Sequence, residues 1–264
     1  MLTSMNLGFN GEVVGYYHAY RRGYPAAVID VIAEAFRLSA DDVVLDLGCG
    51  TGQLTVPLAS RARAVLGIDP EPDMLSHARR AHAQVTNANW LLGADTDIPR
   101  LTTLLGSNTV AALTVGQALH WMNHEQLFRD AIRLLRPQGG IAVVTNGTPL
   151  WLQPTAWSGA LRAVMEEWLQ TTLTAACGTD EESQHTYTSA LREAGYEVTA
   201  AHVDYVDDLD CDSVIGGVFS AMSPNQLPSP SRRRVFESRI RRALTPHEPF
   251  REHVRVAILA AVRP

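Results

Sequence analysis

The sequence predicts an α/β protein built on one doubly wound, mostly parallel sheet. Short apolar runs recur through its first half, at residues 43–47, 65–69, 89–93, 110–115 and 141–145. Helical patterns lie between these runs, for example at residues 72–83 and 124–135. Strands that alternate with helices are typical of βαβ units, and strands that are apolar along their whole length fit a sheet covered on both faces.

The second half of the chain predicts two further strands, which completes a seven-stranded sheet. Residues 187–206 read as a helix, a turn at Gly195 and a strand, and residues 251–264 read as the last strand. The tryptophan-rich residues 148–170 and the arginine-rich residues 229–244 predict helices outside the repeating units. These helices favour an inserted helical cap on the α/β core.

Composition narrows the class of protein. The 264 residues suit one large α/β domain, and the net charge of −6 argues against a nucleic-acid partner, which requires a basic face. No apolar run approaches the length of about 20 residues that a membrane span needs, and the first residues lack the features of a signal peptide. Three widely spaced cysteines, Cys49, Cys177 and Cys211, predict free thiols in the cytoplasm, with neither a disulfide framework nor a metal site. All 22 basic residues are arginine, which excludes lysine chemistry.

A glycine-rich turn follows the first strand, in the segment VVLDLGCGTGQLT (43–55). Glycines in such a turn adopt positive φ and let the backbone approach a ligand closely. The turn lies at the carboxyl end of a central strand, where open α/β sheets bind ligands. A dinucleotide site requires GxGxxG, but Gln53 stands where its third glycine would be. The spacing therefore argues against NAD or FAD.

The string DLGCGTG resembles motif I of the class I methyltransferases that use S-adenosylmethionine (SAM) and release S-adenosylhomocysteine. GQALHWMN (116–123) and YRRGYP (20–25) are similar to segments of the small-molecule branch of that family, although Arg22 replaces a proline of its lid motif. The resemblance implies a Rossmann-like fold in a single domain. Its expected parts are a lid at 1–30, a SAM-binding core at 31–147, cap segments at 148–186 and 207–248, and the last helix and strands of the core at 187–206 and 249–264.

Two carboxylate positions carry the expected cofactor contacts. Asp69 ends the second strand and can accept two hydrogen bonds from a ribose diol, or else cap the helix that follows Pro70. Adenine N6 is expected to contact Asp95, Asp97 or backbone groups, because Ala94 and Asp95 depart from the family pattern. Met74 either packs on adenine or belongs to the core. The full expected cofactor set is Tyr17, Tyr20, Arg21, Asp46, Gly48, Cys49, Gly50, Gly52, Asp69, Pro70, Met74, Ala94, Asp95 and Gln117.

The acceptor is expected to be a small, cationic molecule. His120 is the candidate general base, or a residue that orients the cofactor. Residues 180–212 hold ten acids against one arginine, whereas residues 229–264 hold nine arginines against three glutamates. The acidic segment favours an amine-bearing acceptor. The expected substrate-binding residues are Trp121, Trp151, Asp207, Asp208 and Asp210.

These features are similar to those of aminoglycoside-pathway N-methyltransferases of the gentamicin type, which implies N-methylation of an amino sugar. Two alternatives stay open. One is a carboxyl O-methyltransferase for aconitate-like acids, with arginines of residues 231–242 in the pocket. The other is a regulatory protein that binds SAM without turnover.

Overall fold

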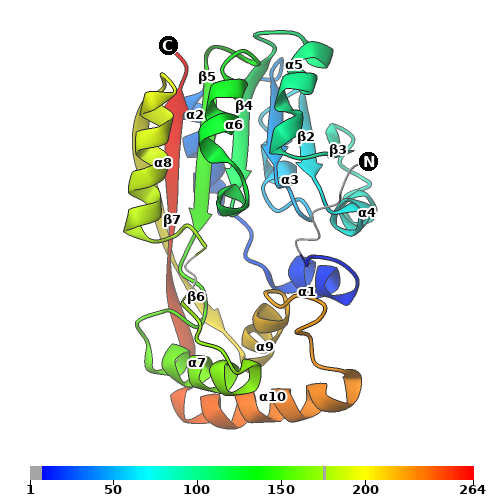
Figure 1. Cartoon of the computed structure of the whole chain (residues 1–264), viewed down its shortest axis with the longest axis vertical. Coiled ribbons are helices and arrows are strands. Elements are labelled where there is room, and N and C mark those ends of the chain that lie inside the picture. Colours follow the sequence, from blue (N-terminus) through cyan, green and yellow to red (C-terminus); the bar gives the residue numbers. More distant parts are fainter. Residues whose placement is uncertain (1–7, 175–176) are drawn as a thin grey trace.

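The computed structural model describes residues 8–174 and 177–264. Its centre is a 7-stranded sheet with the strand order β3-β2-β1-β4-β5-β7-β6 (Figure 1). The first five strands are parallel, and β7 runs antiparallel to both of its neighbours, β5 and β6. The expected mostly parallel sheet is therefore confirmed. The strands are β1 (Val43–Leu47), β2 (Ala64–Asp69), β3 (Ala88–Leu92), β4 (Val110–Gly116), β5 (Leu135–Asn146), β6 (Glu197–Leu209) and β7 (Phe250–Val262).

Helices cover both faces of this sheet and form a cap at one end. They are α1 (Glu12–Tyr20), α2 (Ala26–Ala35), α3 (Thr55–Leu58), α4 (Pro72–Ala81), α5 (Ile98–Leu105), α6 (His124–Ala131), α7 (Ala156–Leu169), α8 (Glu181–Glu193), α9 (Cys211–Phe219) and α10 (Pro230–Leu244). Short 3-10 turns occur at η1 (Asp95–Asp97), η2 (Leu119–Trp121) and η3 (Thr245–His247). Within the described ranges, no helix combines the length and apolar character needed to cross a membrane.

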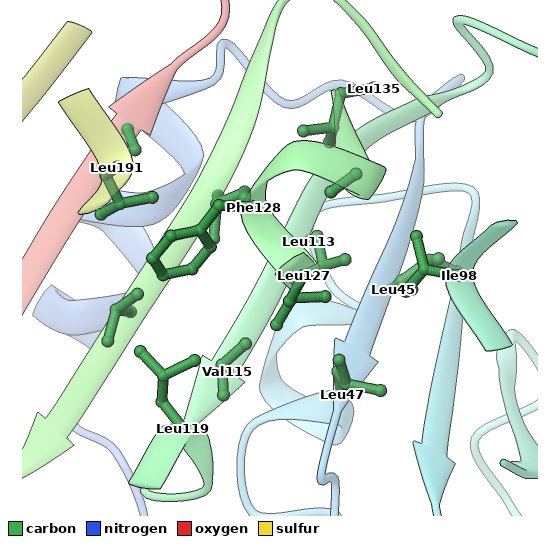
Figure 2. Close-up of a cluster of buried hydrophobic side chains, with 14 of the residues drawn as sticks. Leu45, Leu47, Ile98, Leu113, Val115, Leu119, Leu127, Phe128, Leu135 and Leu191 are labelled. Atoms are coloured by element: carbon green, nitrogen blue, oxygen red, sulfur yellow. The ribbon is translucent and has the colours of Figure 1, made fainter. Parts of the chain in front are cut away.

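Two cores sandwich the sheet because successive side chains of a strand point to opposite faces. Leu45 and Leu113 lie in the cluster under α5, α6 and α8, together with Phe128 of α6 (Figure 2). Val44 and Ala112, one position away on the same strands, lie in the cluster under α2 and α3. Burial on both faces explains why β1 and β4 are apolar without alternation.

The cap is carried by the two antiparallel strands. β5 pairs with residues 256–262 of β7, whereas β6 pairs with all of 250–262, so one end of the β6–β7 ribbon extends past the sheet. Helices α7, α9 and α10 gather around that end, and α1 lies between them and the core (Figure 1). Trp157, Phe219, Phe236 and Phe250 are buried together in this third core.

Two expected boundaries require correction. The lid was expected to end at residue 30, but α2 runs through that position and its Val28 and Ile32 are buried against the sheet. The core strand was expected to end at residue 206, but β6 continues to Leu209 because its pairing with β7 continues. Lid and cap therefore share elements with the core.

Candidate functional site

Two adjoining cavities lie at the carboxyl ends of β1, β2 and β4. The larger has a volume of about 560 Å³ and reaches from the glycine turn to the cap. The smaller, of about 80 Å³, extends over the ends of β1 and β2. The walls of both cavities include the same six residues, Phe9, Tyr17, Gly48, Gly116, Gln117 and Trp121. One ligand that contacts these six residues could therefore extend into both cavities.

The glycine turn is held to β2 by backbone hydrogen bonds. The N–H groups of Gly48 and Cys49 donate to the carbonyl of Ile68 at 2.8 and 3.1 Å. Gly48 has φ of 70°, and a Cβ there would lie 2.4 Å from the Cβ of Ala118. Only glycine therefore permits this approach of the turn to the QALHW segment. Cys49 borders the large cavity, and burial raises the pKa of its thiol.

Gly52 differs from the other two glycines of the motif. It borders neither cavity, and a Cβ on it would lie 2.6 Å from the ring of Trp90. Its expected role in cofactor binding is thus replaced by a packing role behind the turn. Gly50 borders the small cavity, and a Cβ on it would lie 3.4 Å from the ring of Tyr17.

Asp46 holds the turn in place. Its side chain is buried, and its two oxygens accept hydrogen bonds from the hydroxyls of Thr55 at 2.5 Å and Thr114 at 2.8 Å. Burial raises the pKa of Asp46 to about 6, against the opposing effect of the two hydroxyls. Asp46 borders the large cavity, but its main contacts are to the protein.

Asp69 is oriented toward the small cavity by the backbone. Its Oδ2 accepts from the N–H of Gly50 at 2.8 Å, and its Oδ1 accepts from the N–H of Glu71 at 2.9 Å. Each carboxylate oxygen keeps a further acceptor site for a ribose hydroxyl. Burial raises the pKa of Asp69 to about 6. Helix α4 has Glu71 as its N-cap, so the alternative assignment of Asp69 to that position is wrong.

The rest of the small cavity suits a flat apolar ring. Pro70, Met74, Ala94 and Asp95 border it, and Met74 is buried. Asp97 does not border it, because its carboxylate accepts from the N–H of Ala94 at 3.0 Å and pairs with Arg100. Of the two carboxylates expected at the adenine amino group, Asp95 is the one that borders this cavity.

The lid helix α1 closes the cavities from the cap side. Tyr17 borders both of them, and Arg21 borders the large one with its guanidinium 5.2 Å from the centre of the Tyr17 ring. Arg21 also donates to the carbonyl of Ser220 at 3.3 Å, which ties the lid to the end of α9. Tyr20 lies over Gly216 of α9, where a Cβ would lie 2.3 Å from its ring. Tyr20 borders the large cavity but not the small one.

Histidines connect the lid to the glycine turn. His18 of α1 lies 4.4 Å from His77 and 5.7 Å from His82, measured between ring centres. Its Nδ1 is 3.4 Å from the hydroxyl oxygen of Thr51 in the turn. Burial and the neighbouring histidines lower the pKa of His18 and of His77, and Arg80 contributes to the shift of His77.

Gln117 provides the clearest test of fit to a cofactor. Its Oε1 is buried and has no hydrogen-bond partner among residues 8–174 and 177–264. Gln117 borders both cavities, so its side chain belongs to the wall that they share. An unpartnered acceptor here, a ribose-directed Asp69 and a glycine turn fit the chemistry of SAM.

The residues expected to bind the acceptor divide into two groups. His120, Trp121 and Trp151 border the large cavity, with the rings of His120 and Trp121 5.1 Å apart. Burial and the nearby charge of Arg21 lower the pKa of His120, so its imidazole is neutral at neutral pH. It can therefore accept a proton.

The three expected aspartates do not gather at the cavity, which corrects that expectation. Asp207 borders the cavity. Asp208 points to the opposite side of β6 and pairs with Arg251 at 2.8 Å, while Asp210 caps α9 by accepting from the N–H of Ser213 at 2.7 Å. Alternation along β6 and its register with the arginines of β7 cause this separation. Three of the ten acids, Asp204, Asp208 and Asp212, pair with Arg255, Arg251 and Arg241 of the basic segment.

Several residues of the large cavity escaped the sequence analysis. Glu252 is fully buried and accepts two hydrogen bonds from Arg22, both at 2.6 Å. The departure of Arg22 from the lid motif was the one available signal for this pair. Asn146 at the end of β5 and Phe9 before α1 also border the cavity, and Phe9 contacts Tyr17 edge-on at 5.6 Å. These two positions lie outside the recognised motifs.

Comparisons with known proteins identify a methyltransferase domain in this chain. Residues 44–139 match the family described as "Methyltransferase domain". An uncharacterized methyltransferase of Mycobacterium tuberculosis is 39% identical over 142 residues, which cover 54% of this chain and 53% of the relative. Another from Schizosaccharomyces pombe is 32% identical over 197 residues, 67% of this chain and 66% of the relative. The chain thus matches about half the length of its mycobacterial relative.

Solved structures show the same fold. A protein described as a type II methyltransferase from Anaeromyxobacter dehalogenans has a TM-score of 0.55 and 20% identity, covering 92% of this chain and 97% of that one. The YcgJ protein of Bacillus subtilis has a TM-score of 0.56 and 12% identity, with coverage of 90% and 99%. The chain therefore contains a class I SAM-dependent methyltransferase domain, and SAM is the cofactor of that domain.

Proposed function

We propose that this protein transfers the methyl group of SAM to the nitrogen of a small-molecule amine, with an amino sugar of the aminoglycoside type as the favoured acceptor. The observation that carries the proposal is the large cavity that opens from the cofactor wall into the cap. Its volume of about 560 Å³ lies within the usual range for small-molecule sites, roughly 300–1,000 Å³. Tyr20, Trp121 and Trp151 provide flat walls for sugar rings.

The chemistry requires alignment and removal of a proton. SAM supplies an electrophilic methyl group on its sulfonium. The lid residues Tyr17 and Arg21 cover the cofactor wall and exclude water from it. His120 borders the cavity in neutral form, so one of its ring nitrogens can accept the proton that an attacking amine must lose.

The charge of the cavity favours an amine over an acid. The arginines of residues 231–242, which an acid acceptor was expected to use, do not border the cavity. Arg22 does border it, but Glu252 neutralises it. Arg21 is the remaining cavity arginine in the described chain, and its position beside Tyr17 suits the carboxylate of SAM.

A methyl-transfer assay tests the proposal. The protein is incubated with SAM and either kanamycin, glucosamine or aconitate, and mass spectrometry detects added methyl groups. We expect a methylated amine and no methylated acid. His120→Gln should lower kcat by roughly 10²–10⁴-fold, the usual contribution of a general base, and leave S-adenosylhomocysteine affinity unchanged.

The exposed His185→Gln is the matched control and should behave as wild type. Methylation of aconitate alone would contradict the choice of an amine. Cofactor binding without transfer to any acceptor would support the regulatory alternative.

A further inference from the structure

The hydroxyl of Tyr24 lies beside the wall that the two cavities share. Gly116 belongs to that wall, and a Cβ on Gly116 would lie 2.7 Å from Tyr24 Oη. Tyr24 itself borders the large cavity but not the small one. Its hydroxyl is therefore at the point where a ligand that starts over the ends of β1 and β2 and crosses the shared wall enters the large cavity.

This hydroxyl has no hydrogen-bond partner among residues 8–174 and 177–264. Four buried side-chain polar atoms of the described chain also lack a partner, Asn146 Oδ1 among them, but the Tyr24 hydroxyl is not one of the four. It is thus neither bonded nor buried. Because the ring of Tyr24 packs against the core under α2 and α3, the space that the hydroxyl meets is the cavity.

The Tyr24 hydroxyl is uncharged at neutral pH. Burial, together with the nearby Tyr17 and Asp46, raises the pKa of Tyr24 well above its ordinary range. The side chain therefore cannot act as a base for a proton. Its oxygen still carries lone pairs that accept hydrogen bonds, so it is an open acceptor at the entrance to the large cavity.

Hydrogen bonds fix the segment that carries Tyr24. Arg22 binds both oxygens of Glu252 at 2.6 Å and donates to the carbonyl of Asn146 at 2.9 Å. The Nδ2 of Asn146 in turn donates to the carbonyl of Gly23 at 3.0 Å. After Tyr24 the chain enters α2, whose buried face packs on the sheet. Arg22 makes these bonds at the position where the sequence departs from the lid motif, and they hold Tyr24 in place.

We propose that Tyr24 recognises the charged sulfonium methyl of SAM and thereby distinguishes SAM from S-adenosylhomocysteine. The methyl is the group that must face the large cavity, and the sulfonium withdraws electrons from it, so its hydrogens are weak donors to an unpartnered oxygen. S-adenosylhomocysteine lacks both the methyl and the charge. Arg22 and Asn146 are positioning residues that act through Tyr24. The inference rests on the proposed function only for the place of the acceptor in the large cavity.

Calorimetry on the complete protein tests this role, with SAM and S-adenosylhomocysteine titrated separately. The quantity compared is the Kd for S-adenosylhomocysteine divided by the Kd for SAM. Tyr24→Phe should lower this ratio about threefold, the effect of one weak hydrogen bond, and leave the Kd for S-adenosylhomocysteine unchanged. Asn146→Ala should also lower the ratio, because it releases Gly23 beside Tyr24.

Tyr205→Phe is the matched control, because Tyr205 packs against the same core as Tyr24 but borders neither cavity. It should keep the wild-type ratio. The inference is overturned if Tyr24→Phe keeps that ratio, or if it weakens both ligands equally, as a loss of packing would. A wild-type ratio in Asn146→Ala would overturn the positioning role. The titrations contain no acceptor, so methylation of an amine, or its absence, bears on the proposed function alone.

Discussion

The buried ion pair between Arg22 and Glu252 predicts a large loss of folding stability when Arg22 is removed. Glu252 has a side-chain exposure of 0% and Arg22 of 19%, and the two form two hydrogen bonds of 2.6 Å. Arg22→Ala would leave the buried carboxylate with Gln153 as its remaining hydrogen-bond donor among the residues that the structure describes. Breaking a buried pair from one side costs about 3–5 kcal/mol. At about 2–4 °C per kcal/mol for a chain of this size, the melting temperature should fall by roughly 6–20 °C.

Urea denaturation and thermal melting, both without SAM, measure this loss. The matched control is Arg251→Ala, which breaks the solvent-exposed pair with Asp208 on the same strand and should change stability little. The double variant Arg22→Met, Glu252→Met should recover most of the loss, because it leaves no buried charge. If Arg22→Ala is no less stable than Arg251→Ala, or if the double variant is as unstable as Arg22→Ala, the reasoning is wrong.

The remaining predictions concern the cofactor. Asp69→Ala should weaken SAM binding by about 1–3 kcal/mol in calorimetry. The control Asp41→Ala removes an exposed carboxylate that borders neither cavity and should not weaken binding; equal affinities of the two variants would refute the ribose assignment. Arg21→Ala should raise the KM for SAM more than that for the acceptor, and the reverse order would refute its pairing with the cofactor carboxylate. The pKa of His18 is lowered from 6.5 where helix α1 packs against the glycine turn, so protonation of His18 opposes this packing. SAM binding should therefore be strongest above pH 6.5 and should weaken as the pH falls. His18→Gln should weaken less on acidification than wild type, and the exposed His202→Gln should not differ from wild type.

The core strands and the glycine turn could be predicted because their signals are local. β1 and β4 are apolar on both faces, which any strand in the middle of a covered parallel sheet must be. Gly48 and Gly50 follow β1 directly, and Asp69 ends the next strand, so the carboxyl edge of the sheet brings them together. Nine of the sixteen residues that border the small cavity therefore belong to the expected cofactor set.

The cap was harder to predict because its strands extend beyond the sheet. β6 shows simple alternation of exposed and partly buried residues, which does not reveal what covers either face. The expected boundary at residue 206 fell inside this strand for that reason. Asn146, at the end of β5, carries no motif, and its unpartnered oxygen becomes visible only once Gly23 is placed beside its amide.

By itself the sequence determined the class of fold, the cofactor turn and the presence of an acidic and a basic segment in the second half. Tertiary structure decided how those two segments meet. The register of β6 with β7 pairs Asp208 with Arg251 on the outside and sets Asp207 opposite Glu252 at the cavity. Residues more than forty positions apart are aligned by hydrogen bonds between strands, and a shift of one residue would exchange the two faces. Composition records which charges are present, but only this register determines which of them face a ligand.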